Sequence, residues 1–339
     1  MLAVEPAPLG RVADRPVRSL DAVQVLVADD LAAFRAFFQE AMRGKSGLLN
    51  AVIRYVLAQK GKQIRPLLVL LAARASGGVT QATHRAASLV ELLHTATLVH
   101  DDVVDDAERR RGLFSINALW KNKVAVLFGD FLLSRGLLLA LDAKDYDTLH
   151  LLSDAIRRMS EGELLQIEKT RHLDLDEATY FKIISDKTAS LISACTAAGA
   201  TSAGASPEIV GALHTFGEKL GLAFQIRDDL FDYGLEDVGK PLGIDVQEKK
   251  LTLPLIYALR EASSKERRDV LALVRNKKTG DAAARAVAQF AETKGGLAYA
   301  QERMLELAQE ALDALDVLEP SPARDALADL TRFAVYRTK

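Results

Sequence analysis

The chain of 339 residues contains a single cysteine, Cys195, and this scarcity excludes two kinds of structure. One thiol can form neither a disulfide within the chain nor a metal site built from several cysteines. Cys195 lies among small residues, between Ala194 and Thr196. That setting is typical of a buried small side chain rather than of a reactive thiol.

The sequence also lacks an excess of charge of either sign. Its 44 lysines and arginines against 46 aspartates and glutamates give a net charge of −2, which offers no electrostatic basis for binding nucleic acid. Residues 1–20 contain no apolar segment of the kind that a secretory signal needs. The most apolar stretch, residues 124–141, is interrupted by Asp130 and Arg135, which argues against a membrane span. We therefore expect a cytoplasmic protein with no transmembrane segment.

Strand signals are equally scarce. No stretch alternates between apolar and polar residues, and no Asn-Gly hairpin signal is present. Most segments instead are rich in Ala, Leu, Glu, Lys and Arg, with apolar residues at helical spacing. We expect an all-α protein, with a loose arm over residues 1–20 and one domain over residues 21–339. The expected helices span residues 21–43, 64–76, 80–105, 115–141, 145–170, 176–202 and 207–233, with several shorter ones over 252–336.

Two runs of the form Asp-Asp-x-x-Asp, at residues 101–105 and 228–232, stand out from this background. Residues four apart share one face of a helix, so the first and last aspartates of each run lie together. Like charges in that position weaken a helix, and a helix C-terminus is already electronegative. Both runs end helices that are apolar nearly all round. We predict a bound cation at each, and carboxylate oxygens suit Mg²⁺ that is shared with substrate phosphates.

Basic residues recur beside both runs. Each basic cluster alone is typical of a solvated surface, but metal-binding carboxylates with Arg and Lys around one cavity indicate a diphosphate site. The residues concerned are Lys62, Arg65, Arg109, Arg110 and Arg111 around the first run, and Lys240, Lys249 and Lys250 after the second.

Three further polar residues lie in apolar helical segments. His94 shares a face with Asp101, and a role as a core histidine and a role in ligand contact are equally open. Lys187, next to Thr188, must pair or lose its charge if it is buried, unless only its stem is covered. Gln225 lies one turn before the second run and on its face.

In their order, these motifs resemble those of the trans-isoprenyl diphosphate synthases, the polyprenyl synthetase family, from about residue 25 to the end. The sequence of these motifs is most similar to that of long-chain synthases of the octaprenyl type. The motifs that carry the resemblance are Gly61-Lys62-x-x-Arg65-Pro66, His94 to His100 before the first run, Arg110-Arg111-Gly112, Gly162-Glu163-x-x-Gln166, Lys187-Thr188, Phe224-Gln225 before the second run, Gly239-Lys240 and Thr252-Leu253-Pro254-Leu255.

The resemblance implies a bundle of helices around a deep central cavity, and a homodimer. It implies head-to-tail 1′-4 condensation of isopentenyl diphosphate with an allylic diphosphate. Mg²⁺ would be held by Asp101, Asp105 and Asp228, with support from Asp102, Asp229 and Asp232. Isopentenyl diphosphate would be held by Lys62, Arg65, His94 and Arg111. The allylic diphosphate would be contacted by Arg110, Lys187, Thr188, Gln225, Lys240 and Lys250, of which Arg110, Lys187, Thr188 and Gln225 would act in catalysis.

Product length depends on the residues just before the first run, which line the tunnel for the growing chain in this family. Ala96 and Thr97 occupy those positions, where makers of short products often have an aromatic residue. We expect a product longer than geranylgeranyl diphosphate. The alternatives are a farnesyl or geranylgeranyl diphosphate synthase, and a subunit of a heteromeric synthase. A class I terpene cyclase or a head-to-head synthase fits the second aspartate run and the Lys62–Arg65 motif less well.

Overall fold

Helices form nearly all the secondary structure in the computed structural model, which describes residues 12, 19–59, 61–110, 113–234, 248, 250–275 and 281–337. The first helices along the chain are α2 (Leu20–Val25), α3 (Ala28–Ala41), α4 (Gly47–Ala58), α5 (Ile64–Ser76), α6 (Gln81–Val104), α7 (Ile116–Ala143) and α8 (Tyr146–His172). They are followed by α9 (Glu177–Ile184), the π-helical turn η1 (Ser185–Ala189), α10 (Ser190–Ser202) and α11 (Pro207–Phe231). The last are α13 (Leu253–Arg260), α14 (Ser264–Arg275), α15 (Asp281–Thr293), α16 (Gly296–Ala314), the 3₁₀ turn η2 (Leu315–Val317) and α17 (Pro322–Tyr336). The all-α prediction is confirmed.

Local sequence signals set several helix ends. The Thr80 side chain accepts a hydrogen bond from the backbone of Thr83, and Thr83 returns one, so a capping box starts α6. Ser206 caps α11, and Pro207 occupies its first turn. Both starts agree with the sequence-based prediction.

Three features differ from that prediction. The helix expected over residues 21–43 is split into α2 and α3, because Val27 leaves the helical conformation (φ −122°, ψ 26°) and is fully buried. Helix α4 was not expected at all. The helix expected over residues 176–202 contains the π-turn η1, for which the sequence carries no signal. The predicted arm at 1–20 falls almost wholly outside the described residues and stays a prediction.

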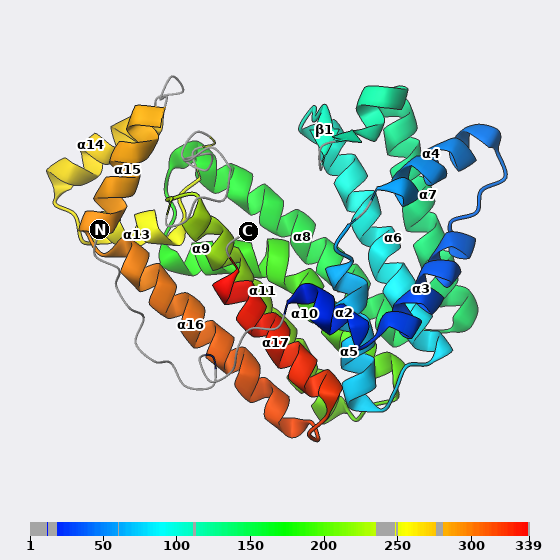
Figure 1. Cartoon of the computed structure of the whole chain (residues 1–339). Coiled ribbons are helices and arrows are strands. Elements are labelled where there is room, and N and C mark those ends of the chain that lie inside the picture. Colours follow the sequence, from blue (N-terminus) through cyan, green and yellow to red (C-terminus); the bar gives the residue numbers. More distant parts are fainter. Residues whose placement is uncertain are drawn as a thin grey trace.

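Two hydrophobic clusters lie side by side and share α11. The first unites α3, α5, α6, α7 and α10, and the second unites α9, α13, α15 and α16 around the C-terminal half of α11. In Figure 1, α6 and α7 pair on one side of the molecule, and α16 and α17 run together along the other. As expected, the helices that carry the aspartate runs, α6 and α11, are largely buried.

A short hairpin follows the first aspartate run, where a non-helical segment was expected. Strands β1 (Arg109–Arg110) and β2 (Leu113–Phe114) pair antiparallel, above the end of α6 in Figure 1. The Tyr55 hydroxyl of α4 donates to the Phe114 carbonyl over 2.6 Å. The guanidinium of Arg109 lies 4.8 Å from the centre of the Phe114 ring. These contacts fix the hairpin at the end of the first run.

Candidate functional site

The second aspartate run ends α11 with one buried and two accessible carboxylates. Asp229 is 6% exposed, whereas Asp228 and Asp232 are half-buried. Asp229 accepts hydrogen bonds from the Gln225 amide at 2.9 Å and from the Tyr180 hydroxyl at 2.7 Å. Because the carboxylate only accepts, these bonds fix the orientation of the Gln225 amide.

The fixed orientation of the Gln225 amide also determines where the Thr188 hydroxyl proton points. The Gln225 amide nitrogen is committed to Asp229, so its oxygen accepts the Thr188 hydroxyl proton at 2.8 Å. The hydroxyl oxygen of Thr188 therefore keeps its lone pairs for another neighbour. A continuous hydrogen-bonded chain runs from Thr188 through Gln225 and Asp229 to Tyr180.

This chain borders a pocket of about 110 Å³. Lys187 contributes to its wall and is held by an ion pair with Glu163 and by a 3.0 Å hydrogen bond to the Gln166 side chain. Lys250 enters the wall from beyond the second run and pairs with Glu248. The polar and charged side chains around the pocket are Gln166, Lys169, Thr170, Tyr180, Lys187, Thr188, Gln225, Asp229, Lys250 and Thr252. The structure thus brings together Lys187, Thr188, Gln225, Asp229 and Lys250 around one pocket, and their roles stay predictions.

Asp228 has a partner from the C-terminal end of the described chain. The Arg337 guanidinium forms an ion pair with the Asp228 carboxylate and lies 3.9 Å from the centre of the Phe224 ring. Burial lowers the pKa of Arg337 from its ordinary value, against the opposing effect of Asp228. Sequence reasoning missed Arg337 and Tyr180, because no local pattern connects either residue to the second run.

The first aspartate run repeats the arrangement of the second. Asp102 is 5% exposed, while Asp101 and Asp105 face solvent. The Asn117 side chain of α7 donates to the Asp102 backbone carbonyl over 3.1 Å. In each run the second aspartate is buried, and the first and last, which share a helix face by their spacing, are more accessible.

The accessible carboxylates suit a divalent cation that is shared with a substrate. Within the part of the chain that the structure describes, no three acidic or histidine side chains converge on a single point. Such an arrangement does not enclose an ion in an all-protein cage. It fits Mg²⁺, which keeps several coordination positions for water and phosphate oxygens and uses one or two carboxylates.

Two of the predicted cationic residues lie at the start of α5, Lys62 just before the helix and Arg65 in its first turn. Lys62 is exposed beside a surface pocket, and its carbonyl accepts from the Gln24 amide at 2.9 Å. Arg65 lines a separate, mainly apolar cavity of about 120 Å³, and Thr188 lines the same cavity. Thr188 therefore borders both this cavity and the pocket at the second run.

The predicted residues on α6 lie deeper. His94 is 7% exposed, and its carbonyl accepts the Thr97 hydroxyl at 2.8 Å. Ala96 is fully buried in the first hydrophobic cluster. Arg110 lies in β1. Arg111 and Lys240 fall outside the described residues, so their predicted roles stay predictions.

Comparison with known proteins gives consistent matches over most of the chain. Residues 46–290 match the family model described as Polyprenyl synthetase. Octaprenyl diphosphate synthase of Escherichia coli (strain K12) is 35% identical over 323 residues, which cover 95% of this chain and 100% of that protein.

Two solved structures are similar over the same length. A decaprenyl diphosphate synthase from Rhodobacter capsulatus aligns with a TM-score of 0.89 and 35% identity, covering 95% of this chain and 100% of that one. A polyprenyl synthase from Caulobacter crescentus CB15, complexed with calcium and isoprenyl diphosphate, aligns with a TM-score of 0.85 and 34% identity, covering 96% and 100%.

Proposed function

The chain belongs to the polyprenyl synthetase family, and we propose that it condenses isopentenyl diphosphate head to tail with an allylic diphosphate to make a long-chain polyprenyl diphosphate. The observation that carries the proposal is the pocket at the second aspartate run. There Lys187, Thr188, Gln225 and Lys250 surround a space that Asp229 of the second run also lines. The relatives from Escherichia coli and Rhodobacter capsulatus are named as octaprenyl and decaprenyl diphosphate synthases, and these names support a long-chain product.

In this proposal the two aspartate runs and the cations bind the allylic diphosphate between them. Asp101, Asp105 and Asp228 would hold Mg²⁺, with Asp102, Asp229 and Asp232 in support. When bound, Mg²⁺ would neutralise charge that develops on the leaving diphosphate. The calcium ion in the Caulobacter crescentus structure is consistent with a divalent cation in this family.

The cationic side chains of the protein stabilise the same charge. Lys187 is fixed by Glu163 and Gln166, so its ammonium group is oriented before the substrate arrives. Lys250 lines the same pocket, and we assign Arg110 and Lys240 to this diphosphate as well. Lys62, Arg65, His94 and Arg111 would bind isopentenyl diphosphate.

Loss of diphosphate leaves positive charge on the allylic carbon, and Thr188 is suited to face it. Its hydroxyl proton points to Gln225, so its oxygen lone pairs are available to a cation in the pocket. The apolar neighbours Ile183, Ile184 and Leu251 exclude water that would otherwise quench the cation. The double bond of isopentenyl diphosphate then forms the new carbon–carbon bond, and a proton leaves, for which the released diphosphate is the available base.

We further propose that the protein acts as a cytoplasmic homodimer that pairs through α7. This helix is long and apolar enough, by length and composition, to cross a membrane, yet only a third of its most apolar stretch is buried. Leu127 is 58% exposed and Leu138 49%, which marks a surface suited to association. Asp130 and Arg135 interrupt the apolar stretch and favour a subunit interface over a membrane span.

The function is tested by incubating the purified chain with Mg²⁺, labelled isopentenyl diphosphate and separate allylic primers, and by chromatography of the dephosphorylated products. We expect products longer than geranylgeranyl. Farnesyl or geranylgeranyl as the sole product would contradict the long-chain assignment. Activity only after addition of a second chain would identify a subunit of a heteromeric synthase. Sedimentation of Leu127→Glu/Leu138→Glu tests the interface: a monomer is expected, and an unchanged dimer would exclude α7 as the contact.

A further inference from the structure

The π-turn η1 carries Lys187 and Thr188, two adjacent residues that line the pocket and contact different helices. The backbone N–H of Ser190 reaches back five residues to the Ser185 carbonyl, which inserts one extra residue into an otherwise α-helical segment. Lys187 then contacts Gln166 of α8, and Thr188 contacts Gln225 of α11. Single π-helical turns inside α-helices are frequently found at functional sites.

The turn packs between α8 and α11, so closely that it lies against the backbone of both helices at a glycine. A Cβ atom at Gly162 would lie 2.9 Å from the Asp186 Cβ and 3.1 Å from the Lys187 nitrogen. A Cβ atom at Gly221 would lie 2.5 Å from the Ala189 Cα. Glycine is therefore required at both positions for the turn to fit. The two glycines in the neighbouring helices thus provide the space that the turn occupies.

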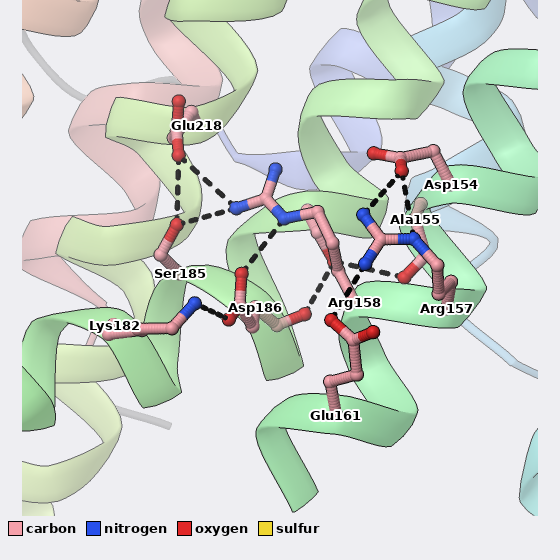
Figure 2. Close-up of polar contacts among 10 residues, drawn as sticks. Asp154, Ala155, Arg157, Arg158, Glu161, Lys182, Ser185, Asp186 and Glu218 are labelled. Atoms are coloured by element: carbon pink, nitrogen blue, oxygen red, sulfur yellow. Dashed lines mark hydrogen bonds and ion pairs between the residues drawn. The ribbon is translucent and has the colours of Figure 1, made fainter. Parts of the chain in front are cut away.

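A network of charged side chains ties the same turn to three helices, as Figure 2 shows. The buried carboxylate of Asp186 accepts from the Arg158 guanidinium at 2.9 Å and from the Lys182 ammonium at 2.8 Å. Arg158 also donates to the Ser185 hydroxyl at 2.8 Å, and that hydroxyl donates to Glu218 of α11 over 2.8 Å. The network joins α8, α9 and α11 through the first two residues of the turn.

The network is stiff because the charge of Asp186 is buried. Burial alone would raise the pKa of Asp186, but the hydrogen bonds from Lys182 and Arg158 outweigh it and hold the pKa below its ordinary value. Removing one partner would leave a buried charge poorly compensated, which is costly. Any rearrangement of the turn must therefore break these contacts.

We propose that Arg158, Ser185 and Asp186 are positioning residues, which hold the π-turn so that Lys187 and Thr188 meet the allylic diphosphate in register. None of the three lines the pocket, so they act through their neighbours in the turn. The inference rests on the proposed function. It predicts that the network controls binding and reaction of the allylic substrate and leaves isopentenyl diphosphate binding unaffected.

The test compares two adjacent arginines of α8. Arg158→Gln removes the guanidinium from the network. The matched control, Arg157→Gln, removes an arginine that also binds two carboxylates, Asp154 and Glu161, but only on the exposed face of α8. KM for each substrate and kcat are measured in one assay, with the wild type alongside. A displacement of about 1 Å at reacting groups can cost roughly a hundredfold in rate.

We expect Arg158→Gln to raise KM for the allylic diphosphate at least tenfold and lower kcat, with KM for isopentenyl diphosphate within twofold of the wild type. Arg158→Lys should recover part of the loss, and Arg157→Gln should behave as the wild type. Ser185→Ala, a small change that a folded protein tolerates, should shift the allylic KM in the same direction. An allylic KM within twofold of the wild type in both Arg158→Gln and Ser185→Ala would overturn the inference. So would equal increases in both KM values. Lack of prenyl transfer by the wild type would instead refute the proposed function itself.

Discussion

The guanidinium of Arg337 is paired with the carboxylate of Asp228, the first residue of the second aspartate run. An incoming cation at this run must compete with that arginine for the same carboxylate. Arg337→Gln is therefore expected to bind Mg²⁺ more tightly, by about fivefold for a coupling of about 1 kcal/mol. Calorimetric titration of Mg²⁺ in the presence of an unreactive allylic diphosphate analogue measures the change. Arg324→Gln, which removes an ion pair with Asp316 instead, is the control. Weaker Mg²⁺ binding in Arg337→Gln would show that the arginine assists the cation.

Tyr180→Phe removes the hydroxyl that donates to the buried carboxylate of Asp229, which also accepts from Gln225. A buried hydrogen bond to a charged group contributes about 1.5–3 kcal/mol, so the free energy of unfolding should fall by about that amount. The Mg²⁺ concentration for half-maximal activity should rise, because Asp229 and Gln225 lose their fixed orientation. Tyr299→Phe also removes a hydroxyl-to-carboxylate bond, to Glu177, but Tyr299 does not line the pocket. An identical Mg²⁺ dependence in the two variants would leave Tyr180 with a purely structural role.

Ala96→Phe is expected to shorten the product. Ala96 is fully buried on α6, just before the first aspartate run, and in our proposal it borders the tunnel for the growing chain, where a phenyl ring would occupy space. Overpacking a buried position typically costs 1–3 kcal/mol, so circular dichroism should accompany the product analysis. Ala96→Leu, with a smaller side chain, should give an intermediate length. Unchanged product length in a folded Ala96→Phe protein would place the floor of the tunnel elsewhere.

The thiol of Cys195 should not react in the native protein. It is fully buried, and burial raises its pKa to about 12, so the reactive thiolate is scarce at neutral pH. A disulfide reagent at pH 8 should label no thiol in the native state and one per chain in denaturant. Rapid stoichiometric labelling of the native protein would show that α10 opens readily.

Sequence patterns predicted the parts of the site that depend on helical spacing. The shared face of the first and last aspartates of each run, which are more accessible than the second, follows from the geometry of one helix. So do the capped starts at Thr80 and Ser206. The sequence also predicted that Lys187 and Gln225 belong together, through resemblance to a family rather than through local physics.

What the sequence did not predict depends on contacts between distant segments. The ion pair between Arg337 and Asp228 joins residues 109 positions apart. The π-turn depends on the missing side chains of Gly162 and Gly221 on two other helices. The start of α4 does have a local signal, since Ser46 caps it by accepting from the Leu49 backbone, but the sequence prediction did not use it.

Prenyl transfer by Asp101→Ala and Asp228→Ala, with and without EDTA, tests the metal–diphosphate site most directly. The paired accessible carboxylates are expected to be essential, so each variant should lose roughly 10²–10³-fold in kcat, and EDTA should abolish activity of the wild type. Asp106→Asn removes a charge directly after the first run, at a left-handed position that asparagine tolerates, and should retain activity. Full activity of either alanine variant, or of the wild type in EDTA, would contradict the assignment of the two runs to one metal–diphosphate site.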